Sequence, residues 1–321
     1  MKKEKVALIG FGYWGKKIYR YLQSSDEFDL QYVYFPSLKD LSEVDIRQKY
    51  GSNFVSSIDL ILNNKGVPNI IIATPIDTHF TLTKQALLKS KNVLVEKPLS
   101  TDPLHSRELL KTAKDLGLKL ETEYTFTYSA ALLHAQEFVK KGTIGKIENI
   151  VIIKKQLGRF LPYDVYNLLG THCLSILDMF IPIRECKFKP KPMMANKGLT
   201  TGAIIDFERK GEKQLGHIDL SLHCPARETK MIIYGQTGTI VYDPNISDTL
   251  KLVCYSRYQQ PGKSKVAVSW EKTHAYDEKH NLEKALKNFS KVIKEEVQDN
   301  SLRAVDITEI ISGFYKNTPA I

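Results

Sequence analysis

Three glycines near the start of the chain have the spacing of a phosphate-binding turn. The apolar run Val6–Ile9 ends at Gly10, and Gly12 and Gly15 follow before a stretch with helical character from Lys16 to Leu22. In a strand–turn–helix unit the first glycine permits the turn, the second lets a pyrophosphate approach the backbone, and the third lets the helix pack close to the strand. The spacing predicts a dinucleotide site, with an ordinary structural turn as the alternative.

Two further short motifs follow runs that predict strands. The run Val67–Ala73 lacks alternation, as expected of a parallel strand covered on both faces. It leads into a turn that holds Thr74, Pro75 and His79. The run Asn92–Val95 ends in Glu96-Lys97-Pro98. A histidine without a visible partner more often packs at a helix start than touches a ligand, and a lysine before a turn proline can be an ordinary surface residue.

These three motifs resemble, in order and spacing, those of the glucose-fructose oxidoreductase, inositol dehydrogenase and rhizopine-catabolism (Gfo/Idh/MocA) family. The resemblance is tight to about Lys97 and looser beyond. It implies an NAD(P)-dependent enzyme in which Lys97 lies beside the nicotinamide and shares its proton with the substrate hydroxyl or carbonyl. The Lys97–Pro98 bond is then expected to be cis. The expected cofactor-binding residues are Gly10, Gly12, Tyr13, Trp14, Gly15, Ser37, Thr74, Pro75, His79, Glu96 and Lys97.

The position that usually binds the adenine ribose is not acidic in this chain. A dinucleotide fold commonly places a carboxylate about 20 residues beyond the glycines, at the end of the second strand. The predicted strand Phe28–Phe35 ends there in Phe35, and Ser37 and Lys39 follow. These two residues favour the 2′-phosphate of NADP, with an ordinary surface loop as the alternative. The cofactor is therefore expected to be NAD or NADP, with a slight preference for NADP.

The second half of the chain holds a candidate catalytic histidine. The stretch around His172 resembles a family segment in which a helix presents a histidine with an aspartate four residues earlier, one turn away on the same face. Here Leu168 stands at the aspartate's position. We expect His172 to bind a substrate hydroxyl or to relay a proton with Lys97, and a packing histidine is the alternative. Four residues are candidates to compensate for the aspartate: Tyr163, Asp164, Tyr166 and Asn167.

Aromatic residues near the middle of the chain are further candidates for the site. Tyr124, Phe126 and Tyr128 occupy the stretch where family members pass from the cofactor domain to the substrate domain. Packing in a core or between domains is the alternative for each. The expected catalytic residues are Lys97 and His172, and the expected substrate-binding residues are Lys97, Tyr124, Tyr166 and His172.

The elements that must position these residues predict two domains in an α/β fold. Residues 1–122 alternate strands and helices, which indicates an N-terminal Rossmann-type, doubly wound parallel sheet. Residues 123–321 begin with a helical stretch and continue with β-like segments between Ile147 and Trp270. This region predicts a substrate-binding and oligomerisation domain with a large, mostly antiparallel open sheet. A strongly amphipathic helix from His280 to Val297 and a second one beginning near Arg303 close the chain.

Composition narrows the range of partners. Lysine and arginine outnumber aspartate and glutamate by 46 to 36, which gives a net charge of +10, but the lysines are scattered and form no recognition element for nucleic acid. The four cysteines, Cys173, Cys186, Cys224 and Cys254, show no metal-binding spacing, so we expect free thiols and no metal. No apolar run has the length of a signal-peptide core or a membrane span. We expect a cytoplasmic homo-oligomer that binds neither nucleic acid nor membranes.

The predicted reaction is hydride transfer between a nicotinamide and a hydroxyl or carbonyl carbon of a sugar, polyol or sugar nucleotide. The alternative is a catalytically impaired, nucleotide-binding regulator or interaction protein of the same fold. Phe35 and Leu168 favour that alternative, because both stand where the family usually carries carboxylates. The retained Lys97 favours the enzyme.

Overall fold

The computed structural model describes residues 3–158, 162–209, 214–246, 249–256 and 267–316. The chain forms two compact units. The first comprises Met1–Tyr124 with Leu282–Glu309, and the second comprises Thr125–Asn281 with Ile310–Ile321. Among the described residues, no helix combines the length and the apolar composition that crossing a membrane requires.

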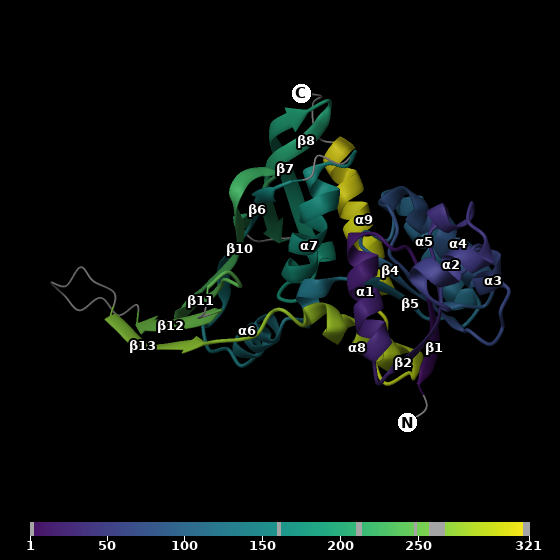
Figure 1. Cartoon of the computed structure of the whole chain (residues 1–321). Helices are drawn as coiled ribbons and strands as arrows, with labels where there is room; N and C mark the ends of the chain where they lie inside the picture. Colours follow the sequence, from purple (N-terminus) through teal and green to yellow (C-terminus); the bar gives the residue numbers. More distant parts are fainter. Residues whose placement is uncertain (1–2, 159–161, 210–213, 247–248, 257–266, 317–321) are drawn as a thin grey trace. The chain divides into compact units, whose positions relative to one another are not determined.

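The first unit is built on a five-stranded parallel sheet with the order β2-β1-β3-β4-β5 (Figure 1). Its strands are β1 (Glu4–Ile9), β2 (Phe28–Tyr34), β3 (Asn69–Ile72), β4 (Asn92–Glu96) and β5 (Leu120–Glu123). The predicted parallel sheet is confirmed. The chain changes direction across the sheet between β1 and β3, and ligands of such folds bind at the carboxyl ends of the strands beside this point.

Helices cover both faces of this sheet. On one face lie α1 (Tyr13–Ser24) and α8 (Asn281–Ile293), whose apolar side chains share a cluster with the strands. On the other face α4 (His79–Leu88) packs on β3 and β4, with α5 (Pro103–Asp115) beside it. The shorter helices of the unit are η1 (Pro36–Leu38), α2 (Glu43–Tyr50), α3 (Asp59–Leu62) and η2 (Ile76–Thr78).

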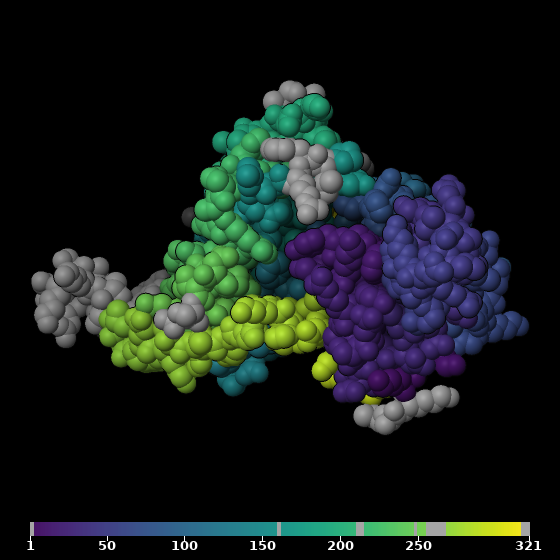
Figure 2. All heavy atoms as spheres, in the orientation of Figure 1, coloured from purple at the N-terminus to yellow at the C-terminus, as the bar shows by residue number. Residues whose placement is uncertain are grey.

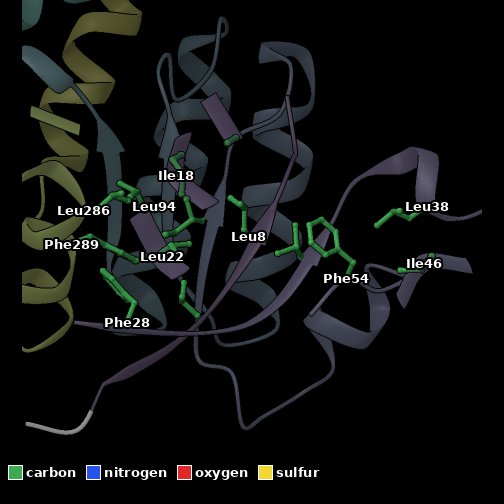
Figure 3. Close-up of a cluster of buried hydrophobic side chains, with 14 residues drawn as sticks. Leu8, Ile18, Leu22, Phe28, Leu38, Ile46, Phe54, Leu94, Leu286 and Phe289 are labelled. Carbon is green, nitrogen blue, oxygen red and sulfur yellow. The ribbon is translucent and has the colours of Figure 1, made fainter. Parts of the chain in front are cut away.

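The core beneath α1 joins segments that are far apart in the sequence. Leu8 from β1, Leu94 from β4 and Leu22 from α1 lie in one buried cluster with Leu286 and Phe289 from α8 (Figure 3). The ring of Phe289 also stacks on that of Phe28 at 6.3 Å. Helix α8 follows nearly all of the second unit in the sequence, yet it completes the core of the first.

The second unit is built on an eight-stranded sheet with the order β13-β12-β11-β10-β6-β9-β8-β7. Its strands are β6 (Ile147–Leu157), β7 (Cys186–Asn196), β8 (Leu199–Arg209), β9 (Gln214–Ser221), β10 (His223–Gly235), β11 (Gly238–Tyr242), β12 (Leu250–Ser256) and β13 (Ala267–His274). Strands β6 and β9 are parallel, and the other neighbouring pairs are antiparallel. The predicted large, mostly antiparallel sheet is confirmed.

One face of this second sheet is covered by helices. They include α6 (Ala130–Lys140), which packs on β11 and β12, and α7 (Thr171–Leu177), which packs on β6. The short helical segments are η3 (Thr125–Tyr128), the π-helical turn η4 (Tyr166–Gly170) and η5 (Ile183–Glu185). The last helix, α9 (Ser301–Lys316), belongs to the first unit up to Glu309 and to the second unit beyond it.

The contact between α8 and the first sheet generates a prediction for stability. Phe289→Ala should lower the free energy of unfolding of the first unit by about 3–5 kcal/mol, because it removes a fully buried ring and leaves a cavity. Urea unfolding measures the change. Leu302→Ala on the exposed side of α9 is the control and should cost less than about 0.5 kcal/mol. Equal losses in the two variants would contradict this role of α8.

Candidate active site

The glycine turn between β1 and α1 is held by two close backbone approaches. Gly10 has φ of +108°, and a Cβ there would lie 2.2 Å from the carbonyl oxygen of Ala73. A Cβ on Gly15 would lie 2.3 Å from the carbonyl oxygen of Gly10. At Gly12, by contrast, no described atom outside its chain neighbours lies within 4 Å of the Cβ position. The turn is thus closed toward the sheet and open beyond it, which fits the approach of a pyrophosphate.

The start of α1 lies at the surface of the first unit, drawn in purple in Figure 2. Helix geometry leaves the N–H groups of a first turn without acceptors inside the helix, and such groups attract phosphates. Tyr13 and Trp14 are both exposed, and Lys17 Nζ lies 4.4 Å and 4.5 Å from the centroids of their rings. This end of the helix therefore combines an open backbone with a nearby cation.

His79 ties together the two loops that follow β3 and β4. Its ring is fully buried, with Nδ1 2.7 Å from the carbonyl oxygen of Pro98 and Nε2 2.9 Å from that of Thr74. Burial lowers the pKa of His79, while the two carbonyl contacts act in the opposite direction. The Thr78 hydroxyl lies 2.7 Å from both Thr74 Oγ1 and the Pro75 carbonyl oxygen, which further orders the loop after β3. We assign His79 to positioning these loops.

Lys97 directly follows β4 at the carboxyl edge of the sheet. Its peptide bond to Pro98 is cis, as the sequence predicts. The side chain is half-buried. Its charge adds to the effect of burial in lowering the pKa of His79, and it opposes the larger effects of burial and Glu123 that raise the pKa of Glu96. A cation is therefore held at the edge where ligands of parallel sheets bind.

Two other predicted site residues of the first unit are buried. Glu96 ends β4 and is 7% exposed, and Tyr124, directly after β5, is 0% exposed. Thr74 is half-buried and Pro75 is exposed. The structure therefore gathers Thr74, Glu96 and Lys97 at one edge of the sheet but places only some of these side chains at the surface.

Aromatic side chains fill the region at the end of β2, where dinucleotide folds commonly carry a ribose-binding carboxylate and this chain has Phe35. Phe35 stacks on Phe11 with ring centroids 5.5 Å apart, and Tyr50 and Phe54 pack edge-on against Phe35. Ser37, in η1, and Lys39, directly after it, remain exposed. The two side chains predicted to bind a 2′-phosphate are thus at the surface.

In the second unit, His172 lies on α7 with its ring against Phe126. The ring centroids are 5.3 Å apart in an edge-to-face arrangement, and Lys154 Nζ lies 4.6 Å from the Phe126 centroid. Lys154 is buried and also donates to Thr229 Oγ1 at 2.9 Å. Lys154 was not among the site residues predicted from the sequence. The pattern that could have indicated it is the alternation of Ile150, Ile152 and Lys154 along β6, which places the lysine on the covered face of the strand.

Leu168 shares the accessible side of this helical segment with His172. Between Val165 and Leu177 these two residues are half-buried, and the others are buried. A leucine therefore stands beside the candidate histidine where the family pattern has a carboxylate. Leu168 and His172, four residues apart, thus lie on one side of the segment as expected, although the segment includes the π-helical turn η4.

Three of the four residues considered as substitutes for that carboxylate contact the end of α9. The Asn167 backbone N–H donates to Asp164 Oδ1 at 2.9 Å, and the Asn167 side chain donates to the Tyr315 hydroxyl at 2.9 Å. Tyr315 in turn donates to Asp164 Oδ2. Tyr166 packs against the Phe314 ring, and burial together with Asp164 raises its pKa to about 12. Tyr163 is half-buried.

Comparison with known proteins identifies the first unit. Residues 4–124 match the GFO_IDH_MocA family model, described as an oxidoreductase family with an NAD-binding Rossmann fold. These residues belong to the Gfo/Idh/MocA family. The resemblance drawn from the three motifs is confirmed.

Two curated relatives each match part of the chain. An uncharacterized oxidoreductase of Streptococcus pneumoniae serotype 4 is 28% identical over 143 residues, which cover 44% of this chain and 38% of that protein. The dTDP-3,4-didehydro-2,6-dideoxy-alpha-D-glucose 3-reductase of Streptomyces violaceoruber is 31% identical over 100 residues, which cover 31% of this chain and 29% of that protein. The chain thus spans less than half of the length of either relative.

A solved structure matches the fold along almost the whole chain. KijD10, a 3-ketoreductase from Actinomadura kijaniata solved in complex with TDP-benzene and NADP, aligns with a TM-score of 0.81 at 13% identity, covering 98% of each chain. At this identity the similarity establishes the fold. The chain therefore resembles KijD10 in fold along almost its whole length.

The open space at Gly12 predicts that a substitution there weakens cofactor binding without destabilising the fold. Gly12→Ala should leave the free energy of unfolding within about 0.5 kcal/mol of the parent value, because its Cβ would have no described atom within 4 Å apart from its chain neighbours. The same methyl group should weaken binding of a nicotinamide dinucleotide at least tenfold, which is about 1.4 kcal/mol. Nucleotide titration followed by protein fluorescence measures the affinity. Unchanged binding would contradict placement of the pyrophosphate at Gly12, while Gly10→Ala is expected to disturb folding itself.

Proposed function

We propose that this chain is an NAD(P)-dependent oxidoreductase that transfers a hydride between a nicotinamide and a hydroxyl or carbonyl carbon of a sugar nucleotide. The observation that carries the proposal is the half-buried Lys97 at the carboxyl end of β4, in a sheet whose glycine turn is open at Gly12. The sugar-nucleotide class is favoured by the named activity of the Streptomyces violaceoruber relative and by the TDP ligand in the KijD10 structure. A net charge of +10 also suits an anionic substrate.

In this proposal the residues of the first unit bind the cofactor and handle a proton. The nicotinamide, when bound, supplies or accepts the hydride. The open backbone at Gly12 and the start of α1 hold the pyrophosphate. His79 keeps the loop that carries Thr74 close to the loop that carries Pro98. Lys97 gives its proton to a substrate carbonyl oxygen during reduction, or takes the proton from a hydroxyl during oxidation.

His172 is proposed to bind the substrate hydroxyl or to exchange a proton with Lys97. Its ring is oriented by the edge-to-face contact with Phe126, whose ring is in turn held near Lys154. Leu168 cannot orient or charge the imidazole as a carboxylate would. The orientation of His172 is therefore supported by packing, and Lys97 carries the larger share of the acid–base work.

We further propose that NADP is the preferred cofactor. A carboxylate at the end of β2 would repel a 2′-phosphate, and here Phe35 occupies that position within an aromatic cluster. The Ser37 hydroxyl and the Lys39 ammonium are exposed just beyond it and are suited to bind the phosphate. The Phe35 ring, unlike a carboxylate, offers no hydrogen-bond acceptor to the ribose hydroxyls of NAD.

Replacement of Lys97 tests the proposed acid–base role. Lys97→Met should reduce turnover of a sugar-nucleotide substrate by roughly 10²–10⁴-fold, because the proton donor is lost. Cofactor affinity should stay within about threefold, which corresponds to less than 1 kcal/mol. Absorbance of the reduced nicotinamide reports turnover, and Lys65→Met, at an exposed lysine, is the control.

Full activity of the Lys97→Met protein would remove this residue from the mechanism. Tight cofactor binding by the parent protein, with no turnover of any sugar nucleotide, sugar or polyol, would instead favour a nucleotide-binding regulator.

The cofactor preference has a separate test. The double variant Ser37→Ala/Lys39→Ala should weaken NADPH binding by roughly 10- to 100-fold, because contacts to a charged phosphate contribute about 1.5–3 kcal/mol. NADH lacks the 2′-phosphate, so its affinity should change little and serves as the internal control. Equal effects on both cofactors would show that these residues do not read the 2′ position.

A further inference from the structure

Two carboxyl groups end neighbouring strands at the edge that holds Lys97. Glu96 is the last residue of β4 and Glu123 the last residue of β5, and they are direct partners in the parallel register of the two strands. Partners in register point to the same face of the sheet. Both residues are buried, at 7% and 3% exposure. Two carboxyl groups are therefore confined side by side with little access to water.

The surroundings of Glu96 do not supply the donors that a buried carboxylate requires. Among the described residues no group donates a hydrogen bond to Glu96 Oε1. The backbone N–H of Lys97 interacts with the carboxyl group, and the charges that act on it are those of Glu123 and Lys97. Glu121, two residues before Glu123 on the same face of β5, is instead held by Asn300 and Asn288.

Two adjacent buried carboxyl groups cannot both ionise without a large cost, because like charges repel strongly where water is excluded. We propose that Glu96 and Glu123 share one proton and that Glu123 acts as a positioning residue, which keeps a single negative charge beside Lys97. Burial, followed by the charge of Glu123, raises the pKa of Glu96 well above its usual range, in agreement with this arrangement.

The pair has a consequence for Lys97 that rests on the proposed function. One negative charge balances the Lys97 ammonium, whereas two would stabilise the ammonium further and make its proton harder to release. The shared proton therefore keeps Lys97 able to exchange a proton with substrate. Glu123 need not touch the substrate or the cofactor to have this effect.

Protein stability tests the shared proton without any need for turnover. The unfolded chain releases this proton near the ordinary glutamate pKa of about 4.3, whereas the folded pair retains it. The stabilising contribution of the retained proton is therefore complete below that value and is lost as pH rises toward the raised folded pKa. The melting temperature of the parent protein should fall by roughly 3 °C or more between pH 6 and pH 9 relative to Glu123→Gln. The amide in this variant mimics the protonated acid and cannot ionise.

Glu121→Gln is the matched control, because it makes the same chemical change two residues away on the same strand. It removes a carboxylate that accepts hydrogen bonds from Asn300 and Asn288, so it should lower the melting temperature by a similar amount at both pH values. A pH slope in Glu123→Gln equal to that of the parent would overturn the proposal.

Two further readouts separate this proposal from the proposed function. The infrared spectrum of the parent protein at pH 7 should contain the carbonyl band of a protonated carboxylic acid that is missing in Glu123→Gln, and its absence from the parent would overturn the pair. If turnover is observed, its basic limb should move to lower pH by roughly half a unit or more in Glu123→Gln, because at high pH the parent pair loses its shared proton and places two negative charges beside Lys97, whereas the variant places only one. An unmoved limb would overturn the effect on Lys97, even if the infrared band is present.

Discussion

The close approach of two backbone segments at the end of β1 is the constraint on which the site depends. A side-chain carbon on Gly10 would meet the Ala73 carbonyl oxygen, and one on Gly15 would meet the Gly10 carbonyl oxygen. The end of β1, the end of β3 and the first turn of α1 can be this close only because both residues are glycine. The same closeness leaves Gly12 facing outward, so a steric requirement of the fold also creates the open backbone that a phosphate needs.

The remaining chemistry of the first unit follows from its parallel sheet. All the strands deliver their carboxyl ends to one edge, so residues that are distant in the sequence meet there. His79 fixes the relation between the loops after β3 and β4 through two backbone carbonyls. Lys97 and the buried pair Glu96 and Glu123 lie at the same edge. The arrangement combines an acid–base group with a local charge balance.

Much of the first unit could be predicted because its signals are local. Unalternating apolar runs indicated buried parallel strands, and the three motifs indicated the family. Contacts between distant segments had no such signal. The amphipathic pattern of α8 showed that one side must be buried, but not that it would pack against Leu94 and Phe28. The pairing of Glu123 with Glu96 could not be predicted from the sequence, because it depends on the register of β4 and β5.

The second unit was predicted less completely, for physical reasons that particular residues illustrate. The edge strand β7 contains Pro190 and Pro192, which weaken a strand signal because proline cannot donate to a sheet ladder, although an edge position tolerates it. The missing aspartate at Leu168 was recognised. The residues near His172 could not be predicted, because the contacts of Phe126 with His172 and Lys154 join η3, α7 and β6, which are separate in the sequence.

Hydride transfer to a sugar-nucleotide carbon is the central claim, and isotope transfer tests it most directly. Reduced cofactor carrying deuterium at both C4 positions would be incubated with the protein and a panel of dTDP- and UDP-linked ketosugars, and the nucleotide sugars would then be analysed by mass spectrometry. The account predicts a reduced sugar nucleotide that has gained one deuterium on carbon. A tightly bound cofactor that transfers no deuterium to any ketosugar tested would contradict it.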